Sequence, residues 1–288
     1  MNWKIAAIVI VGISLLICIS AAVYVGLEIF HSLPIAQART DCNSNNFDVS
    51  IRGCSAILQS SSATDADRTY AHFQRGLSYE RKGDMDHAIQ DDSEVIKVSP
   101  KEAMAYNNRG FAYQRKGDLD HAIADYDHAI QLVPELGIAW FNRGVAYNLK
   151  GDYTSAIEDF NRVVKLEPKN PMAWNNRCYY RAIVGQLDDA LADCNKSLQL
   201  QPGVGATLDS RAFTYLKMKK YDLALADYDA AIKGNEGHAG SGAHAAWLYG
   251  RGLARRAKHD LTGSESDIAA AKRIDPGIVE QFRKYGVS

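Results

Sequence analysis

Apolar and small side chains recur at steps of three and four residues along most of the chain. In the stretch 137–170 these positions are Trp140, Gly144, Tyr147, Ala156 and Phe160. Such steps place side chains on one face of an α-helix, so the stretch predicts two amphipathic helices, one on each side of Gly151 and Asp152. The Asp after the turn glycine can cap the start of the second helix, and Pro168 ends that helix. The pattern therefore predicts a helix–turn–helix unit.

The same pattern returns every 34 residues. Prolines recur at this interval, as do glycines at two positions of the unit and alanines at one. The recurring residues are Pro100, Pro134, Pro168 and Pro202; Gly76, Gly110 and Gly144; Gly83, Gly117, Gly151 and Gly185; and Ala88, Ala122, Ala156, Ala190 and Ala224. A fixed period of this length is the signature of an array of stacked repeats.

The residues at these positions resemble the tetratricopeptide repeat, a helix–turn–helix unit of the same length. The resemblance covers six units, at 69–102, 103–136, 137–170, 171–204, 205–238 and 245–278. It implies an all-α fold, a right-handed superhelical solenoid of stacked helix pairs with a concave groove. Six extra residues precede the sixth unit, and we expect a mobile loop at 237–244.

Both ends of such an array need helices that cover the apolar faces of the terminal units. Upstream, Asp48–Gln59 predicts a single helix within an amino-terminal cap segment, 39–68. Downstream, Ile278–Tyr285 predicts a short helix that forms a carboxy-terminal cap with the last residues, 279–288.

Residues 5–27 carry no charged side chain. A helix of this length spans the ~30 Å hydrocarbon core of a bilayer. Two interpretations remain open for residues 1–38. They are either a secretory signal cleaved after Ala38, in the triplet from Ala36 to Ala38, or an uncleaved signal anchor. Because Lys4 precedes the apolar stretch, both interpretations place everything after Leu27 on the exported side of a membrane, which we expect to be the bacterial periplasm.

Each unit carries an Arg at its seventh position and an Asp at its twenty-third. The arginines are Arg75, Arg109, Arg143, Arg177, Arg211 and Arg251, and the aspartates are Asp91, Asp125, Asp159, Asp193, Asp227 and Asp267. The seventh position lies on the packing side of the first helix, so we expect a ladder of hydrogen-bonded Arg–Asp pairs between helices. The alternative is a row of arginines that binds phosphate or acidic ligands.

Four cysteines follow the membrane segment. Cys178 and Cys194 replace the usual Gly and aromatic residue of one unit, on the facing sides of its two helices, and Cys42 and Cys54 lie at the amino-terminal cap. An even number of cysteines in an exported domain predicts two disulfides, Cys42–Cys54 and Cys178–Cys194. The alternative is buried free thiols.

Composition and motifs predict no catalytic, cofactor-binding or metal-binding residue. With 33 Lys and Arg against 34 Asp and Glu, the net charge is −1, which argues against a nucleic-acid partner. Known nucleophile, zinc and phosphate-binding motifs are absent from the sequence, so we predict neither an enzyme nor a small-molecule substrate. His238 and His244 could bind a metal, but without a carboxylate or Cys at ligand spacing a plain linker is the simpler interpretation.

The first helix of each unit carries aromatic and amide side chains on the face opposite to its packing side, and the family resemblance implies that this face lines the groove. We call it the groove face. Its predicted partner-binding residues are Phe73, Gln74, Asn107, Asn108, Phe111, Phe141, Asn142, Asn175, Asn176, Tyr179, Phe213 and Tyr249. Aromatic rings supply contact area, and amides can pair with an extended backbone. Alternatively, Phe111, Tyr179 and Phe213 fill the gap between neighbouring first helices.

These features predict a non-catalytic scaffold or adaptor of the cell envelope. Its partner would be a protein or a peptide segment that binds in the groove, and its membrane contact would be the amino-terminal helix. The alternative is a structural component that self-assembles through the edges or caps of the solenoid.

Overall fold

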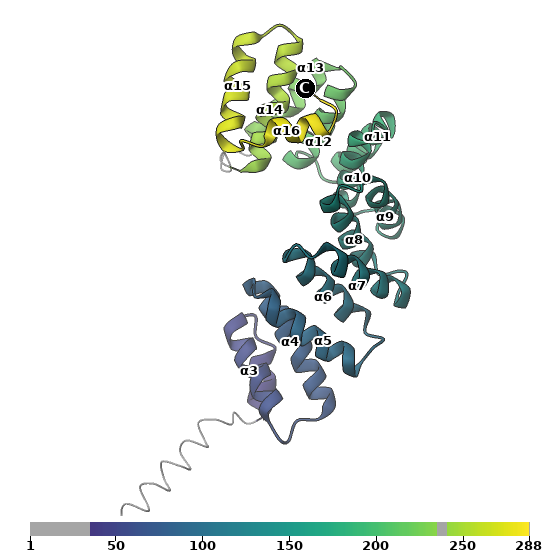
Figure 1. Cartoon of the computed structure of the whole chain (residues 1–288), viewed down its shortest axis with the longest axis vertical. Helices are drawn as coiled ribbons and strands as arrows, with labels where there is room; N and C mark the ends of the chain where they lie inside the picture. Colours follow the sequence, from purple (N-terminus) through teal and green to yellow (C-terminus); the bar gives the residue numbers. More distant parts are fainter. Residues whose placement is uncertain (1–34, 235–240, 288) are drawn as a thin grey trace, which may run out of the picture. The chain divides into compact units, whose positions relative to one another are not determined.

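The computed structural model of the chain describes residues 35–234 and 241–287. Within these ranges every regular element is an α-helix (Figure 1). The chain forms two compact parts, one up to Lys116 and one from Gly117. The expected membrane segment, 5–27, lies outside the described residues. No helix of the described residues is long and apolar enough to cross a membrane.

Five helices of the described residues belong to the first part. They are α2 (Ile35–Cys42), α3 (Phe47–Gln59), α4 (Asp65–Lys82), α5 (Met85–Val98) and α6 (Ala103–Arg115).

Ten described helices make up the second part. They are α7 (Leu119–Leu132), α8 (Gly137–Lys150), α9 (Tyr153–Leu166), α10 (Pro171–Ile183), α11 (Leu187–Leu200), α12 (Gly205–Lys217), α13 (Tyr221–Lys233), α14 (Gly242–Ala257), α15 (Leu261–Ile274) and α16 (Ile278–Lys284).

The helix pairs follow the 34-residue units predicted from the sequence. The turn glycines Gly83 and Gly151 have φ angles of 83° and 79°, a left-handed conformation that glycine adopts without strain. Asp152 then caps α9, since its side chain accepts a hydrogen bond from the backbone amide of Ser155. The expected class of fold, an all-α array of helix pairs, is therefore confirmed, while its right-handed superhelical turn stays a prediction.

One boundary predicted from the sequence differs in the structure. Ser241 caps α14 and the helix begins at Gly242, so that the end of the expected loop, 242–244, is helical and His244 is buried. In the first unit, α4 begins before residue 69, because Thr64 and Asp67 form a capping box at its start. The remaining part of the expected loop, 237–240, lies outside the described residues.

The amino-terminal cap is a hairpin of two helices, α2 and α3, where the sequence predicted one helix. A disulfide between Cys42 and Cys54 joins them. The helices approach so closely that a Cβ atom on Gly53 would lie 2.4 Å from the backbone nitrogen of Cys42. Ala38 and Ile57 are buried in the same small core.

The predicted Arg–Asp ladder is present. Within a unit the guanidinium binds both carboxylate oxygens, with distances of 2.6–3.0 Å, in the pairs Arg75–Asp91, Arg143–Asp159, Arg177–Asp193, Arg211–Asp227 and Arg251–Asp267. The remaining nitrogen, Nη1, reaches the second helix of the preceding unit, as in the contact of Arg143 with Asp127 at 2.5 Å. Each of these arginines therefore holds three helices together.

The second disulfide joins Cys178 of α10 to Cys194 of α11. In the preceding unit the same two positions are Gly144 and Phe160, and a Cβ atom on Gly144 would lie 2.8 Å from the Phe160 ring. The disulfide therefore occupies the space of a glycine–aromatic contact. Both predicted cysteine pairs are disulfides in the structure.

Candidate protein-binding site

The structure divides the predicted groove residues into accessible and covered ones. Phe73, Gln74, Phe111, Phe141, Asn142, Asn175, Asn176 and Tyr179 are partly exposed, whereas Asn107, Asn108, Phe213 and Tyr249 are buried. Phe141 also contributes to a core, since its ring lies edge-on against Phe160 with the centroids 5.2 Å apart. The predicted site is therefore not one continuous exposed surface.

A cavity in the first part of the chain contains two of the predicted residues, Phe73 and Gln74. Its volume is about 640 Å³, and it opens between the amino-terminal half of α4, the end of α5 and the start of α6. The cavity is lined by Asp65, Ala66, Thr69, Tyr70, Phe73, Gln74, Val95, Val98, Ser99, Glu102 and Met104.

Most of this lining is apolar and within reach of solvent. The side chains of Tyr70 and Val98 remain 40% and 60% exposed, although both are large and apolar. Tyr70 is held in place because its hydroxyl donates a hydrogen bond to the Asn43 side chain in the turn before α3. Exposed apolar groups that surround a cavity are the usual mark of a binding site.

The charged residues that line the cavity are both acidic. Asp65 lies in the first turn of α4, and Glu102 precedes α6, where its carboxylate accepts a hydrogen bond from the backbone amide of Met104. No Lys or Arg is among the lining residues. The cavity therefore offers an apolar surface with negative charge at its edge.

Sequence reasoning missed the residues that α5 and α6 contribute. Val95, Val98, Glu102 and Met104 lie at the end of a second helix and the start of the next unit, away from the groove face of any first helix. A signal was present at Val98, since a large apolar residue near the end of a helix has no neighbour in the next turn to bury it.

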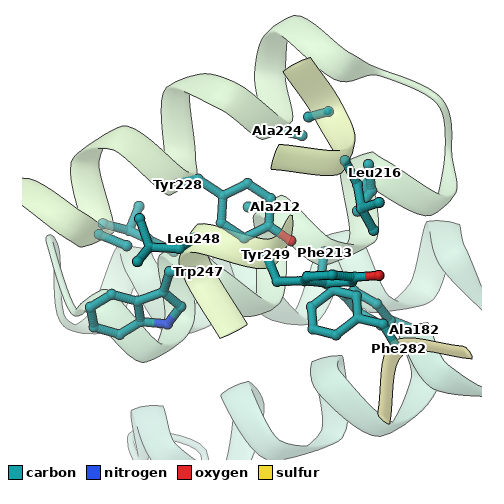
Figure 2. Packing of buried hydrophobic residues seen from close by; sticks show 14 of the residues in the cluster. Ala182, Ala212, Phe213, Leu216, Ala224, Tyr228, Trp247, Leu248, Tyr249 and Phe282 are labelled. Atoms are coloured by element: carbon teal, nitrogen blue, oxygen red, sulfur yellow. The ribbon is translucent and has the colours of Figure 1, made fainter. Parts of the chain in front are cut away.

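In the second part, the chain itself covers the groove face at α12 and α14. The short helix α16 lies over Phe213 and Tyr249, and its residue Phe282 is buried between them (Figure 2). Phe213 and Tyr249 were predicted to contact a partner, and in the structure α16 packs against both rings, so that neither is accessible while α16 is in place. Tyr179 also lies under the end of α16, and burial together with the nearby Tyr285 raises the pKa of Tyr179.

The groove face of α12 also holds a carboxyl group without a nearby cation partner in the described structure. Asp209 is largely buried, which raises its pKa to about 7, and the hydrogen bond from Trp247 only partly opposes this effect. His244, considered above as a metal ligand, packs its ring against Trp247 with the centroids 6.0 Å apart. No group of three or more His, Cys, Asp or Glu side chains in the described ranges is placed to hold a metal ion.

Fold and site together define a helical-hairpin repeat protein with exposed apolar surface between its helices. Family models described as tetratricopeptide repeat match residues 69–102, 103–136, 137–170 and 211–277. The chain therefore belongs to the tetratricopeptide repeat family, as the resemblance implied. A comparison with curated proteins gives no match.

Solved structures with the same fold include three that cover most of this chain. A tetratricopeptide repeat protein from Parabacteroides merdae is 19% identical, with a TM-score of 0.65, and covers 88% of this chain and 97% of its own. PilW, described as a widely conserved type IV pilus biogenesis factor, is 19% identical, with a TM-score of 0.63 and coverages of 74% and 96%. YrrB, described as a repeat protein with an unusual peptide-binding site, is 18% identical, with a TM-score of 0.52 and coverages of 69% and 100%. At these identities the likeness concerns the fold.

Proposed function

We propose that this protein is a non-catalytic scaffold that binds a peptide segment of a partner protein in the cavity between α4, α5 and α6. The observation that carries the proposal is the cavity of about 640 Å³ with an apolar lining and an acidic edge. Membership of the tetratricopeptide repeat family supports binding of protein, since repeat arrays present extended surfaces to partners.

The chemistry of the cavity defines the segment that would bind. A large apolar side chain would bury itself against Tyr70, Phe73 and Val98, which is worth about 1.5–3 kcal/mol per side chain. A Lys or Arg beside that side chain would pair with Asp65 or Glu102. We therefore expect an apolar segment with an adjacent basic residue, and we expect salt to weaken its binding.

The proposal is tested by selecting peptides from a random display library on the full-length protein and measuring their affinities by fluorescence anisotropy. We expect selected peptides to combine a large apolar residue with Lys or Arg. Val98→Glu should reduce their affinity at least tenfold, because the new charge would lie in the apolar lining.

Leu261→Glu is the matched control, because Leu261 is as exposed as Val98, at 60%, and lies in α15 far along the chain. It should leave the affinity unchanged. Equal affinity of the wild-type and Val98→Glu proteins would refute the cavity as the binding site, and so would an equal loss in both variants.

We further propose that the binding domain lies on the exported side of a membrane and stays attached through residues 5–27. The two disulfides support an oxidising compartment. Cleavage after Ala38 would remove the first half of α2, including Ala38, which is 1% exposed and packs in the core of the amino-terminal hairpin. This position of Ala38 favours the uncleaved anchor over the cleaved signal.

Self-assembly through the end of the array has less support. The exposed side chains of α15 are mostly polar, among them Glu265, Ser266, Lys272 and Arg273, although the large apolar side chain of Leu261 is exposed at the first position of the helix. A face of this kind would bury little apolar area between two copies, and we therefore favour partner binding.

A further inference from the structure

The carboxy-terminal helix α16 has an apolar side that is deeply buried. Ile278 is fully buried and Phe282 is 4% exposed. The Phe282 ring lies 4.8 Å from the ring of Tyr249 in α14 and 5.8 Å from that of Phe213 in α12, measured between centroids (Figure 2). The helix is thus seated on the groove face of two successive first helices.

Tyr285 extends this contact to two earlier units. Its ring centroid lies 6.0 Å from that of Tyr179 in α10 and 6.2 Å from that of Tyr153 at the start of α9. A helix that only capped the array would need to cover α15, the last helix of the last unit. The ring contacts of Phe282 and Tyr285 therefore extend from α14 back to α9, which is more than capping requires.

A single cation fastens the end of α16. The ammonium group of Lys217 donates hydrogen bonds to the carbonyl oxygens of Tyr285, at 2.9 Å, and Ile183, at 2.8 Å, and lies 5.6 Å from the centroid of the Phe213 ring. The two carbonyls belong to the ends of α16 and α10, where the helix dipole favours a positive charge. Burial lowers the pKa of Lys217.

In its length and in the polarity of its two sides, α16 resembles a short peptide bound to the surface of another protein. It has seven residues, a length at which a helix is not stable in water on its own. Its opposite side is polar, with Glu280, Arg283 and Lys284 exposed. Its helical structure therefore depends on the surface that it covers.

We propose that the groove face of α10, α12 and α14 is a binding site for a short amphipathic helix with two aromatic side chains one turn apart, and that α16 is the intramolecular ligand that fills it until such a helix of a partner protein displaces it. This is the helix-in-groove mode of recognition. The proposal extends the proposed function to a second surface, and it depends on different residues from those of the cavity between α4 and α6.

A tethered ligand competes at a high effective concentration, so that a partner helix binds only to the fraction of molecules in which α16 is released. Weakening α16 without damaging the surface beneath it should therefore strengthen binding of the same helix supplied as a separate peptide. This consequence requires no knowledge of the natural partner.

The test uses a fluorescein-labelled peptide with the sequence of residues 275–287 as its probe. Its affinity is measured by anisotropy for the full-length wild-type protein and for the double variant Phe282→Ala with Tyr285→Ala. We expect the double variant to bind the probe at least tenfold more tightly than the wild type. A peptide that carries the same two substitutions should bind neither protein.

A second variant decides the question if the double variant fails to fold, as judged by circular dichroism. Arg283→Pro interrupts α16 from its exposed side and leaves every residue of the surface beneath it in place. It should raise the affinity for the probe and speed hydrogen exchange of residues 278–287, whereas Arg283→Ala, which is compatible with a helix, should do neither.

The proposal is overturned if a folded double variant, or a folded Arg283→Pro variant, binds the probe no better than the wild type does. Val98→Glu, which tests the cavity in the first part, should leave probe binding unchanged, so the two proposals can fail separately.

Discussion

At the scale of single residues, the repeated Arg combines several interactions in one side chain. Arg143 binds both oxygens of Asp159, reaches Asp127 with its remaining nitrogen, and lies 4.8 Å from the Trp140 ring centroid. The Asp159 side chain is only 3% exposed. Since each of the three nitrogens of this guanidinium already binds a carboxylate of the protein itself, the alternative of an arginine row that binds acidic ligands loses its support.

Replacing Arg143 with Ala should lower the free energy of unfolding by about 3–5 kcal/mol, because it leaves Asp159 buried without its cation. Urea denaturation followed by circular dichroism measures this loss. The control is Lys150→Ala, which breaks an exposed ion pair with Asp120 and should therefore cost much less. Equal losses in the two variants would contradict the ladder as a source of stability.

Asp209 has the opposite environment, a buried carboxyl without a nearby cation partner in the described structure. Its pKa is about 7 in the folded protein, compared with an ordinary value of 3.8. The groups that face it are Trp247, which donates a hydrogen bond, and the hydroxyl groups of Tyr179 and Tyr228, whose pKa values burial raises and the Asp209 charge raises further. Folding therefore favours the protonated carboxyl.

Because the folded-state pKa is the higher one, the contribution of Asp209 to stability is present below about pH 4 and is lost as the pH rises through about 7. Asp209→Asn removes this dependence. We expect its melting temperature to match that of the wild type near pH 4 and to exceed it increasingly up to pH 8. A difference between the two proteins that does not change with pH would show that Asp209 is not buried in this way.

At the scale of elements, the fourth unit replaces the packing of its neighbours with a covalent bond. The Gly144–Phe160 contact of the third unit corresponds to the disulfide Cys178–Cys194. Closing a loop of this size stabilises a protein by about 3 kcal/mol in the chain-entropy model. The two solutions fill the same space between the first and second helices.

Because the disulfide and the glycine–aromatic contact fill the same space, we expect that one can partly replace the other. Cys178→Ser with Cys194→Ser should lower the free energy of unfolding by about 3 kcal/mol, because it removes the bond and leaves a small void. Cys178→Gly with Cys194→Phe should recover part of that loss, because it restores the glycine–aromatic contact. Chemical denaturation of both variants checks this, and a Gly/Phe variant less stable than the Ser/Ser variant would refute it.

The helix pairs could be predicted because apolar and small residues recur in each of them at helical spacing. The helix α2 could not, since its eight residues contain a single turn of apolar spacing, and its stability comes from the disulfide and from packing on α3. The start of α14 was missed because Gly, Ala and His around Ser241 are typical of a loop, and only the Ser241 cap makes them helical.

Only part of the candidate site could be predicted, because the pattern within a helix does not show its long-range contacts. Periodicity identifies which face of a first helix is free of packing, and it led to Phe73 and Gln74 in the cavity. It does not show which free faces another segment will cover. The position of α16 over Phe213 and Tyr249 is a long-range contact that no local pattern encodes.

At the scale of the whole molecule, the repeat array carries two separate surfaces that we propose as partner sites. One is open, the cavity between α4, α5 and α6, and the other is filled by the chain's own α16. An array whose repeats each contact mainly their neighbours can carry several independent sites along its length.

The proposed attachment to a membrane makes a prediction for the intact protein. Mass spectrometry of the membrane fraction, with thiols alkylated before any reduction, should find a chain that begins at Met1 with Cys42, Cys54, Cys178 and Cys194 unlabelled. A soluble chain that begins at Arg39 would mean that the signal is cleaved. Labelling of all thiols would place the domain in a reducing compartment.

Hydrogen–deuterium exchange can show whether the open cavity binds a partner segment as proposed. A peptide selected on the full-length protein should slow amide exchange in residues 65–74 and 95–104, which line the cavity, and should leave α15 unaffected. The Val98→Glu variant should lose this protection. Protection confined to other helices, or unchanged protection in Val98→Glu, would contradict the claim.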